Sequence, residues 1–414
     1  MAAGQVDRAS TAASRAWPSI TGRDFLIGLL DYRGEMERAL AMCVDNAAQR
    51  IQQLRRRRPR PARLRELGPD QRVFLSGFFK SGSSAVLDYL RGFQGVARWA
   101  PAGELRLIKS VGGLARLTTG YANHAVLTPR DLVALYLHLT GAKHTTSPRG
   151  SYDKWRVVNR NSANLFRRRE AAGYLQTCLE CFLALAERAG EPWPGGLPAL
   201  EQCLREYVRR ALDAAATDTG ADLLLLDQGV NAWRLPLSRL APPSTFVVVH
   251  RDPRDQFVDA RAALRQPGRV EPSAASFADT YQRRRRGAVR DAAKIAQAYG
   301  HRSVRVGFED FVYDPASVHA LVESLSLAGR PYRQGRFEVA RARAAVGKHT
   351  RHLTREESET IAAALPEYLD ERAGQRVRAG QDLVSGARSR HRAAPPRPRN
   401  TTGPGAAANP AGSG

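Results

Sequence analysis

Continuous apolar runs along the chain predict a sheet that is covered on both faces. Residues 222–227 and 245–250 are apolar without the alternation of a half-exposed strand, and residues 73–75 are β-branched or large. Such runs are typical of parallel strands between helices. Further strands are expected at 95–101 and 304–308. The pattern therefore predicts an α/β fold with a central parallel sheet flanked by helices.

Helical spacing of apolar residues fills the intervals between these strands. It predicts one or two amphipathic helices over 23–54, mostly helical structure over 130–214 and a long helix near 275–299, where Arg283 to Arg286 are expected to form a solvated face. Residues 110–214 are interpreted as a helical insertion, which on a parallel α/β core often covers the functional site and selects the ligand. The predicted domains are a helical extension with a basic linker at 1–62, an α/β domain at 63–384 and a disordered tail at 385–414.

The stretch from Val73 to Leu90 has the pattern of a strand, a Gly/Ser turn and a helix. Backbone N–H groups at the start of such a helix point toward one spot, where they favour an anion. Lys80 adds a full charge, Gly82 permits close backbone approach, and the serines of the turn add hydroxyl donors. The stretch predicts a phosphate or sulfate site; an ordinary surface turn is the alternative.

The same stretch differs from the phosphate loop of ordinary ATPases. That loop requires Gly-Lys-Ser/Thr after a spacer, and here Phe79 precedes Lys80. The sequence argues against an ATPase loop.

A second candidate anion site follows the strand at 245–250. Asp252 can cap a helix that has Pro253 at its first position, which leaves Arg251 at the carboxyl end of the strand. Open α/β sheets bind ligands at that edge, and a guanidinium can donate two parallel hydrogen bonds to a phosphate. An ion pair with a neighbouring carboxylate is the alternative role for Arg251.

Composition adds a strong positive charge to this picture. The 414 residues carry a formal net charge of +24, which attracts nucleic acid, anionic membranes and anionic cofactors or glycans alike. Four cysteines are too few for a disulfide framework, and Cys178 and Cys181 lie in a helical pattern that favours packing over metal binding. No apolar run approaches the ~20 residues of a membrane span, and no signal peptide is evident, so a cytoplasmic protein is expected.

Three ordered motifs resemble those of the sulfotransferases that use 3′-phosphoadenosine 5′-phosphosulfate (PAPS). Lys80-Ser-Gly-Ser-Ser84 resembles their 5′-phosphosulfate loop, Arg251-Asp-Pro-Arg-Asp-Gln256 their 3′-phosphate motif, and Gly307 to Pro315 the segment after the next strand. Over residues 71–365 the chain is identified as a member of this family. The resemblance implies a P-loop-type fold, PAPS as donor, no metal, and a hydroxyl or amine acceptor on a glycan, glycolipid or small natural product.

The resemblance also implies roles for individual residues. Glu104, 24 residues after Lys80 in Ala-Gly-Glu-Leu, resembles the base of the carbohydrate-type branch, with Asp227 as the fallback base. The late segment from Val346 to Arg351 resembles the basic loop that closes over the 3′-phosphate. The expected catalytic residues are Lys80 and Glu104, and the expected cofactor-binding residues are Lys80, Ser81, Gly82, Ser83, Ser84, Arg251, Lys348 and Arg351.

Two positions depart from the family pattern. Asp259 stands where many members carry a serine that holds the 3′-phosphate, so either it turns away or Arg254 and Arg261 compensate its charge. Asp227 to Asn231 replace a Lys-x-Pro segment, so a second lysine near the sulfuryl group is not expected.

Two other functions stay open at this point. A P-loop kinase would share the strand, loop and helix but would need the missing Gly-Lys-Ser/Thr and Mg²⁺. A non-catalytic adaptor or nucleic-acid-binding protein would explain the charge, yet no aromatic residues are interleaved with the arginine runs. The sequence assigns neither the acceptor nor the oligomeric state.

Overall fold

The computed structural model describes the central part of the chain. The residues it describes are 36–57, 63–78, 80–99, 107–109, 112–140, 143–144, 155–156, 171–230, 232–264, 271–333 and 337–369. Glu104, the first part of the predicted helices at 23–54, the linker at 58–62 and the tail at 385–414 lie outside them.

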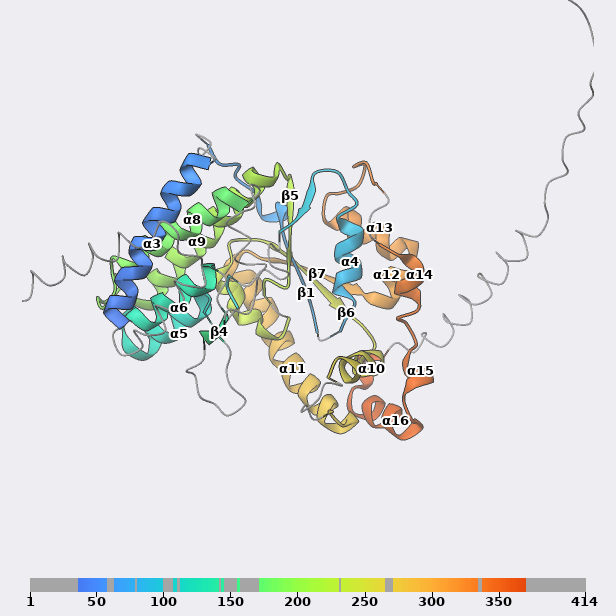
Figure 1. Cartoon of the computed structure of the whole chain (residues 1–414). Coiled ribbons are helices and arrows are strands. Elements are labelled where there is room, and N and C mark those ends of the chain that lie inside the picture. The colour runs from blue at the N-terminus through green and yellow to red at the C-terminus, as the bar shows by residue number, and fades with distance from the viewer. Residues whose placement is uncertain are drawn as a thin grey trace, which may run out of the picture. The chain divides into compact units, whose positions relative to one another are not determined.

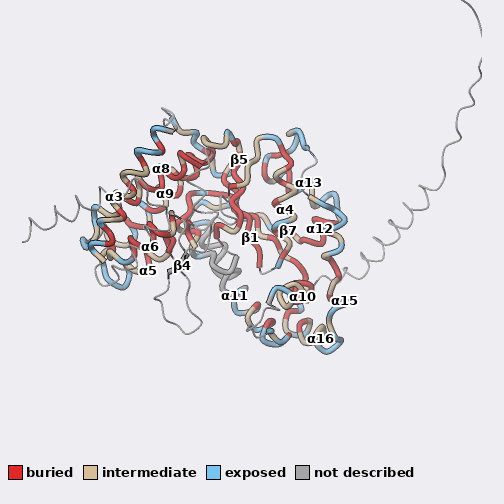
Figure 2. The backbone as a smooth tube through the Cα atoms, in the orientation of Figure 1, coloured by how far each residue is buried: buried red, intermediate tan, exposed pale blue. Residues whose placement is uncertain are grey.

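A five-stranded parallel sheet forms the centre of the fold, as the apolar runs predict (Figure 1). Its order is β2 (Val96–Arg98), β5 (Leu223–Asp227), β1 (Arg72–Gly77), β6 (Thr245–His250) and β7 (Arg302–Gly307). β1 lies in the middle, where Val73 is in register with Leu225 of β5 and Thr245 of β6. All residues of β1 and β5 are buried, so their apolar side chains face helices on both sides (Figure 2).

Helices follow the strands closely and bring their carboxyl ends together. α4 (Ser83–Leu90) follows β1, α10 (Pro253–Leu264) follows β6, and α12 (Phe308–Tyr313) follows β7. α13 (Pro315–Ser324), α14 (Val339–Arg343), α15 (His349–His352) and α16 (Arg355–Ala364) come next, and α10 contacts both α15 and α16. Segments far apart in sequence therefore meet around the ends of β1 and β6.

The first helix of the described residues packs on the predicted insertion. α3 (Met36–Arg57) contacts α6 (Pro129–Thr140) and α8 (Ala172–Ala186), while α9 (Gly196–Thr219) contacts α8 and α5 (Leu114–His124). Their apolar side chains share one core with Phe74 and Leu224 of the sheet. A short antiparallel pair, β3 (Lys143–His144) with β4 (Trp155–Arg156), lies within this segment.

A buried ion pair joins this helical segment to the central strand. Arg72 of β1 donates to Asp213 of α9 over 3.0 Å, and the two side chains are 4% and 2% exposed. Asp213 also accepts from Leu67 N and from Arg209. Both ions thus have polar partners in a region that excludes water.

A second apolar cluster packs against the start of the loop after β1. Phe78 meets residues of α10, α16 and the long helix α11 (Ala274–Tyr299), including Tyr281. Arg285 lies 3.6 Å from the ring centroid of Tyr368 in η6 (Pro366–Tyr368) and donates to the Tyr281 hydroxyl. Arg283 is exposed as predicted, but for Arg285 the prediction of a solvated face is wrong because aromatic rings cover it.

Two further short helices complete the described elements. They are the 3-10 helices η2 (Pro69–Gln71) and η5 (Ala232–Leu240). Among the described residues, no helix combines the length and the apolar character needed to cross a membrane.

Candidate anion-binding site

The loop between β1 and α4 has the shape that the sequence predicts. β1 ends at Gly77, and Gly82 precedes the helix with a φ of 86°. Lys80 is exposed, whereas Ser81 and Ser83 are buried. Ala85 N–H donates to Gly82 O, which leaves the N–H groups of Ser83 and Ser84 to present partial positive charge at the start of α4.

Two glycines allow this loop to fold tightly. A Cβ added at Gly77 would lie 1.8 Å from Ser81 Oγ, and one at Gly82 would lie 2.3 Å from a ring carbon of Phe308. Ser81 Oγ is buried without a hydrogen-bond partner among the described residues. The loop is thus a close-fitting cradle with an unused hydroxyl in its wall, which suits an anionic ligand.

The end of β5 supports the loop from the other side. Gln228 follows β5, and its Nε2 donates to Ser83 Oγ over 3.0 Å. Its backbone N–H donates to Leu75 O of β1 over 2.9 Å. These contacts fix the first turn of α4 relative to two strands of the sheet.

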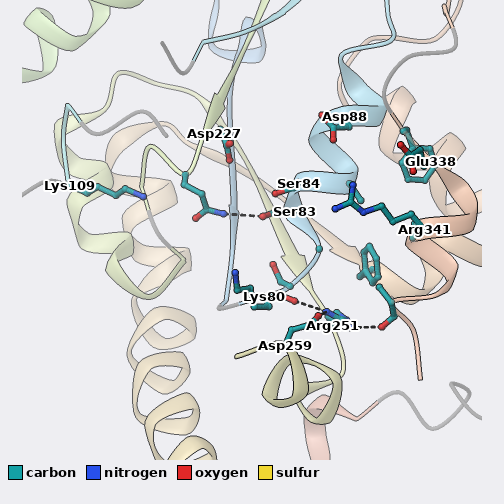
Figure 3. Close-up of a pocket in the computed structure, with 18 residues that line it drawn as sticks. Lys80, Ser83, Ser84, Asp88, Lys109, Asp227, Arg251, Asp259, Glu338 and Arg341 are labelled. Carbon is teal, nitrogen blue, oxygen red and sulfur yellow. Dashed lines mark hydrogen bonds and ion pairs between the residues drawn. The ribbon is translucent and has the colours of Figure 1, made fainter. Parts of the chain in front are cut away.

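A pocket of about 680 Å³ opens over these strand ends (Figure 3). The cradle from Lys80 to Ala85, Asp227, Arg251 and Asp259 all line it. The pocket therefore joins the two halves of the site that the sequence treats separately. It brings together Lys80, Ser81, Gly82, Ser83, Ser84 and Arg251 among the predicted residues.

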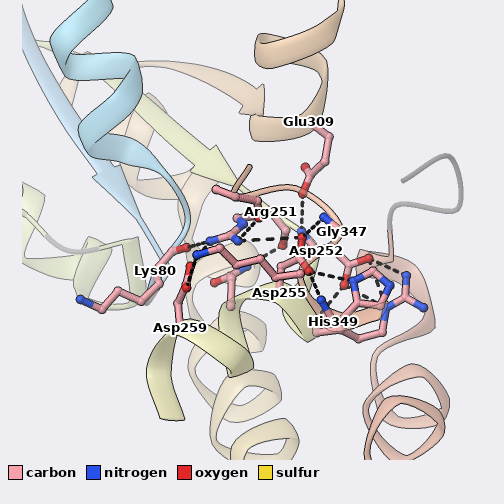
Figure 4. A network of polar contacts seen from close by, with 12 residues as sticks. Lys80, Arg251, Asp252, Asp255, Asp259, Glu309, Gly347 and His349 are labelled. Atoms are coloured by element: carbon pink, nitrogen blue, oxygen red, sulfur yellow. Dashed lines mark hydrogen bonds and ion pairs between the residues drawn. The ribbon is translucent and has the colours of Figure 1, made fainter. Parts of the chain in front are cut away.

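Arg251 is held at the carboxyl end of β6 by several acceptors (Figure 4). Its NH1 donates to Lys80 O over 2.9 Å and to Asp259 Oδ2 over 2.6 Å, and its NH2 donates to Ala345 O. The guanidinium lies 5.5 Å from the ring centroid of Phe308. The side chain is 2% exposed, so Arg251 is a buried cation attached directly to the backbone of the Lys80 loop.

Asp259 lies between the cations Lys348 and Arg251. Arg254 and Arg261, which were expected to compensate its charge, are not its partners. Its Oδ1 accepts from Lys348 Nζ over 2.7 Å, while Oδ2 accepts from Arg251. Burial alone would raise the pKa of Asp259, but the hydrogen bonds from Lys348 and Arg251 hold that pKa below its ordinary value. The carboxylate is thus fully charged at neutral pH.

The prediction that Arg254 and Arg261 compensate the charge of Asp259 is therefore wrong. Arg254 folds back to pair with Asp252 over 2.6 Å, and Arg261 pairs with Glu357 over 2.7 Å. On α10 Arg254 lies five residues before Asp259 and Arg261 two residues after it, so neither shares its face of the helix, and other carboxylates engage both arginines.

Asp252 caps α10 as predicted, and its backbone is hydrogen-bonded to the first turn of α12. Its Oδ1 accepts from Arg254 N over 2.8 Å, and its own N–H donates to Glu309 Oε1 over 2.9 Å. Glu309 is buried directly after β7. The predicted Phe-Glu-Asp segment thus locks the turn that holds Arg251.

The late basic segment reaches the site through one lysine. Asp255 accepts from Gly347 N over 2.6 Å and from His349 N over 2.8 Å, which fixes this segment against α10. Lys348 then meets Asp259, behind the pocket wall. Arg351 is exposed and does not line the pocket.

The two candidate bases are placed differently by the structure. Asp227 lines the pocket at the end of β5, but its carboxylate accepts a hydrogen bond from Arg98 of β2. Glu104 lies outside the described residues, so its role stays a prediction. His250 precedes Arg251, and its burial, with Arg285 and Arg305 nearby, lowers its pKa to about 3, which leaves it neutral.

Sequence reasoning missed several residues of the pocket. Lys109 and Arg341 extend into it from opposite sides, and Phe337 and Glu338 complete the wall near Arg341 (Figure 3). Lys109 is a second lysine that lines the same pocket as Lys80. No sequence motif contains Lys109. It follows β2 in the chain, and only the tertiary structure brings it to the pocket.

The fold and the pocket define an α/β protein with a candidate anion-binding loop at the carboxyl ends of parallel strands. A sequence model described as "Sulfotransferase family" matches residues 72–329, which is more than half of the chain. The chain therefore belongs to the sulfotransferase family.

Two solved structures of sulfotransferases are similar to this chain. A sulfotransferase from Mycobacterium tuberculosis is 15% identical, with 86% of this chain and 98% of that chain covered and a TM-score of 0.35. One from Mycobacterium avium is 13% identical, with 85% and 97% covered and a TM-score of 0.33. No curated protein sequence matches the chain.

Proposed function

We propose that the protein transfers a sulfuryl group from PAPS to a hydroxyl or amine of an acceptor. The observation that carries this proposal is the direct hydrogen bond from Arg251 to Lys80 O, within one pocket at the ends of β1 and β6. This hydrogen bond connects two parts of the proposed donor site. The Lys80 loop is suited to bind the 5′-phosphosulfate, and Arg251 is suited to bind the 3′-phosphate. The buried, unpaired Ser81 hydroxyl and the tight cradle fit such an anion.

PAPS supplies the sulfuryl group, and the protein supplies charge and position. Lys80, the amides of α4 and the serine hydroxyls neutralise the phosphate that becomes the leaving group. Lys109 adds a second positive charge from the opposite wall of the pocket. This neutralisation by protein groups gives the proposed reaction no need for a metal ion.

Glu104 is the proposed base, as in the carbohydrate-type branch of the family. Asp227 already accepts from Arg98 and must break that ion pair to take up a proton. We keep Asp227 as the fallback base. The proposed acceptors are glycans, glycolipids and small natural products, selected by residues 110–214.

A binding titration separates this function from its two alternatives. The full chain is titrated with 3′-phosphoadenosine 5′-phosphate (PAP), ATP with Mg²⁺ and single-stranded DNA at one ionic strength, because salt screens the large positive charge. We expect PAP to bind most tightly, and labelled PAPS to transfer sulfate to a component of a metabolite extract. Tighter binding of ATP–Mg²⁺ would support a kinase, and tighter binding of DNA a nucleic-acid-binding protein.

A further inference from the structure

Asp259 occupies the place in the site where an external anion would be expected. It bridges Arg251 and Lys348 over 2.6 and 2.7 Å, and it lines the pocket itself. Its side chain is 24% exposed, while that of Arg251 is 2% exposed. A ligand that enters the pocket therefore meets the Asp259 carboxylate before it meets Arg251, while Lys348 does not line the pocket.

The existing hydrogen bonds of Arg251 leave few N–H donors for a ligand. NH1 is shared between Lys80 O and Asp259, and NH2 donates to Ala345 O. Nε is buried and has no hydrogen-bond partner among the described residues. A phosphate can use the outer face of Arg251 only if Asp259 gives up its own hydrogen bonds.

We propose that Asp259 is a built-in counter-anion that competes with the 3′-phosphate of the donor nucleotide and so sets how strongly this protein prefers 3′-phosphorylated nucleotides. The inference rests on the proposed function. To admit the phosphate, Asp259 must break two charge-assisted hydrogen bonds, or else stand beside the phosphate at a cost in repulsion. Either way the 3′-phosphate binds more weakly, and spent PAP leaves more readily, than it would with a neutral side chain at this position.

The test compares two nucleotides that differ only in the 3′-phosphate. PAP and adenosine 5′-monophosphate are titrated into the wild-type chain, Asp259→Asn and Asp259→Ser at one ionic strength. We expect both variants to bind PAP about tenfold more tightly, since an anionic competitor at hydrogen-bond distance is removed. Binding of adenosine 5′-monophosphate should stay within about twofold of wild type.

The control removes the same charge elsewhere. Asp279 pairs with Arg283 over 2.8 Å on α11, where both side chains are exposed, and it does not line the pocket. Asp279→Asn raises the net charge by the same amount as Asp259→Asn, so it should leave the ratio of the two dissociation constants at its wild-type value. Thermal unfolding verifies that each variant is folded.

The outcomes distinguish failure of the inference from failure of the proposed function. An unchanged ratio in a folded variant, or weaker binding of PAP alone, overturns the inference; the second result would make Asp259 a residue that positions Arg251 for the phosphate. If neither the wild type nor the variants bind PAP, the proposed function fails and the inference fails with it.

Discussion

Lys80 lies in the loop between β1 and α4; it is exposed and lines the pocket. Lys80→Ala should lower kcat about a hundredfold, or on the order of 3 kcal/mol, because its charge is needed most as the bridging oxygen becomes a leaving group. The dissociation constant of PAP should change much less. Steady-state kinetics and a PAP titration on the same preparation give both values. An unchanged kcat would remove Lys80 from the mechanism.

Glu104 and Asp227 can be separated by amide substitutions that keep size and polarity. If Glu104 is the base, Glu104→Gln should lower kcat by about 10²–10⁴ and leave PAP binding intact, as expected for loss of general-base catalysis. An acidic phenol, already partly ionised, should restore much of the rate, whereas a sugar hydroxyl should not. Rates with both acceptors test this.

Asp227→Asn is the matched variant for this experiment. It removes the other candidate carboxylate, which is paired with Arg98. If Asp227→Asn shows the larger loss with an alcohol acceptor and Glu104→Gln keeps a rate close to wild type, the role of base passes to Asp227.

Single residues show where sequence reasoning reaches its limit. Local chemistry predicted that Lys80 and Arg251 each follow a strand, and both line one pocket because the ends of parallel strands share one edge. The partners of Asp259 could not be predicted, since Lys348 comes from a distant segment. Lys109 could not be predicted either, because a lysine without a motif is indistinguishable from a surface residue.

The turn into α4 depends on a glycine that touches another element. Gly82 has a φ of 86°, and a Cβ there would lie 2.3 Å from Phe308 of α12. Gly82→Ala should lower the free energy of unfolding by more than the ~1–2 kcal/mol of a left-handed residue, because Phe308 must also move. It should weaken PAP binding too, since Phe308 packs on Arg251. Urea unfolding and a PAP titration measure the two effects.

Gly220 provides the matched control for this change. It caps α9 with a φ of 68°, and a Cβ there would meet no atom within 4 Å. Gly220→Ala should therefore show the backbone cost alone, with PAP binding unchanged. Equal losses of stability and affinity in both variants would mean that the contact with Phe308 is unimportant.

Elements were easier to predict than contacts between elements. The three inner strands β1, β5 and β6 were expected from their own apolar runs, and the helix cap at Asp252 from its own turn. The contact of Gly82 with Phe308 joins segments far apart in the chain, so no local pattern contains it. Burial of Arg285 among rings has the same origin, because Phe78 and Tyr368 come from opposite ends of the domain.

The helical segment and the sheet form one unit through a buried ion pair. Asp213→Asn would leave Arg72 buried without its carboxylate, and its side chain is 4% exposed. We expect a loss of about 3–5 kcal/mol in the free energy of unfolding, the range for breaking one side of a buried pair. Urea unfolding of the full chain measures it, with exposed Asp279→Asn as a control that should change by less than about 1 kcal/mol. A loss no larger than that of the control would show that the pair is dispensable.

The position of β1 also has a consequence for how the molecule is made. β1 ends at Gly77, but the strands on either side of it begin only at Leu223 and Thr245. During synthesis the central strand therefore emerges long before either neighbour exists, with both of its hydrogen-bonding edges unpaired. Such long-range pairing makes folding slow. A chain cut short before Thr245 would keep an apolar strand with an open edge, a ready template for association with other chains.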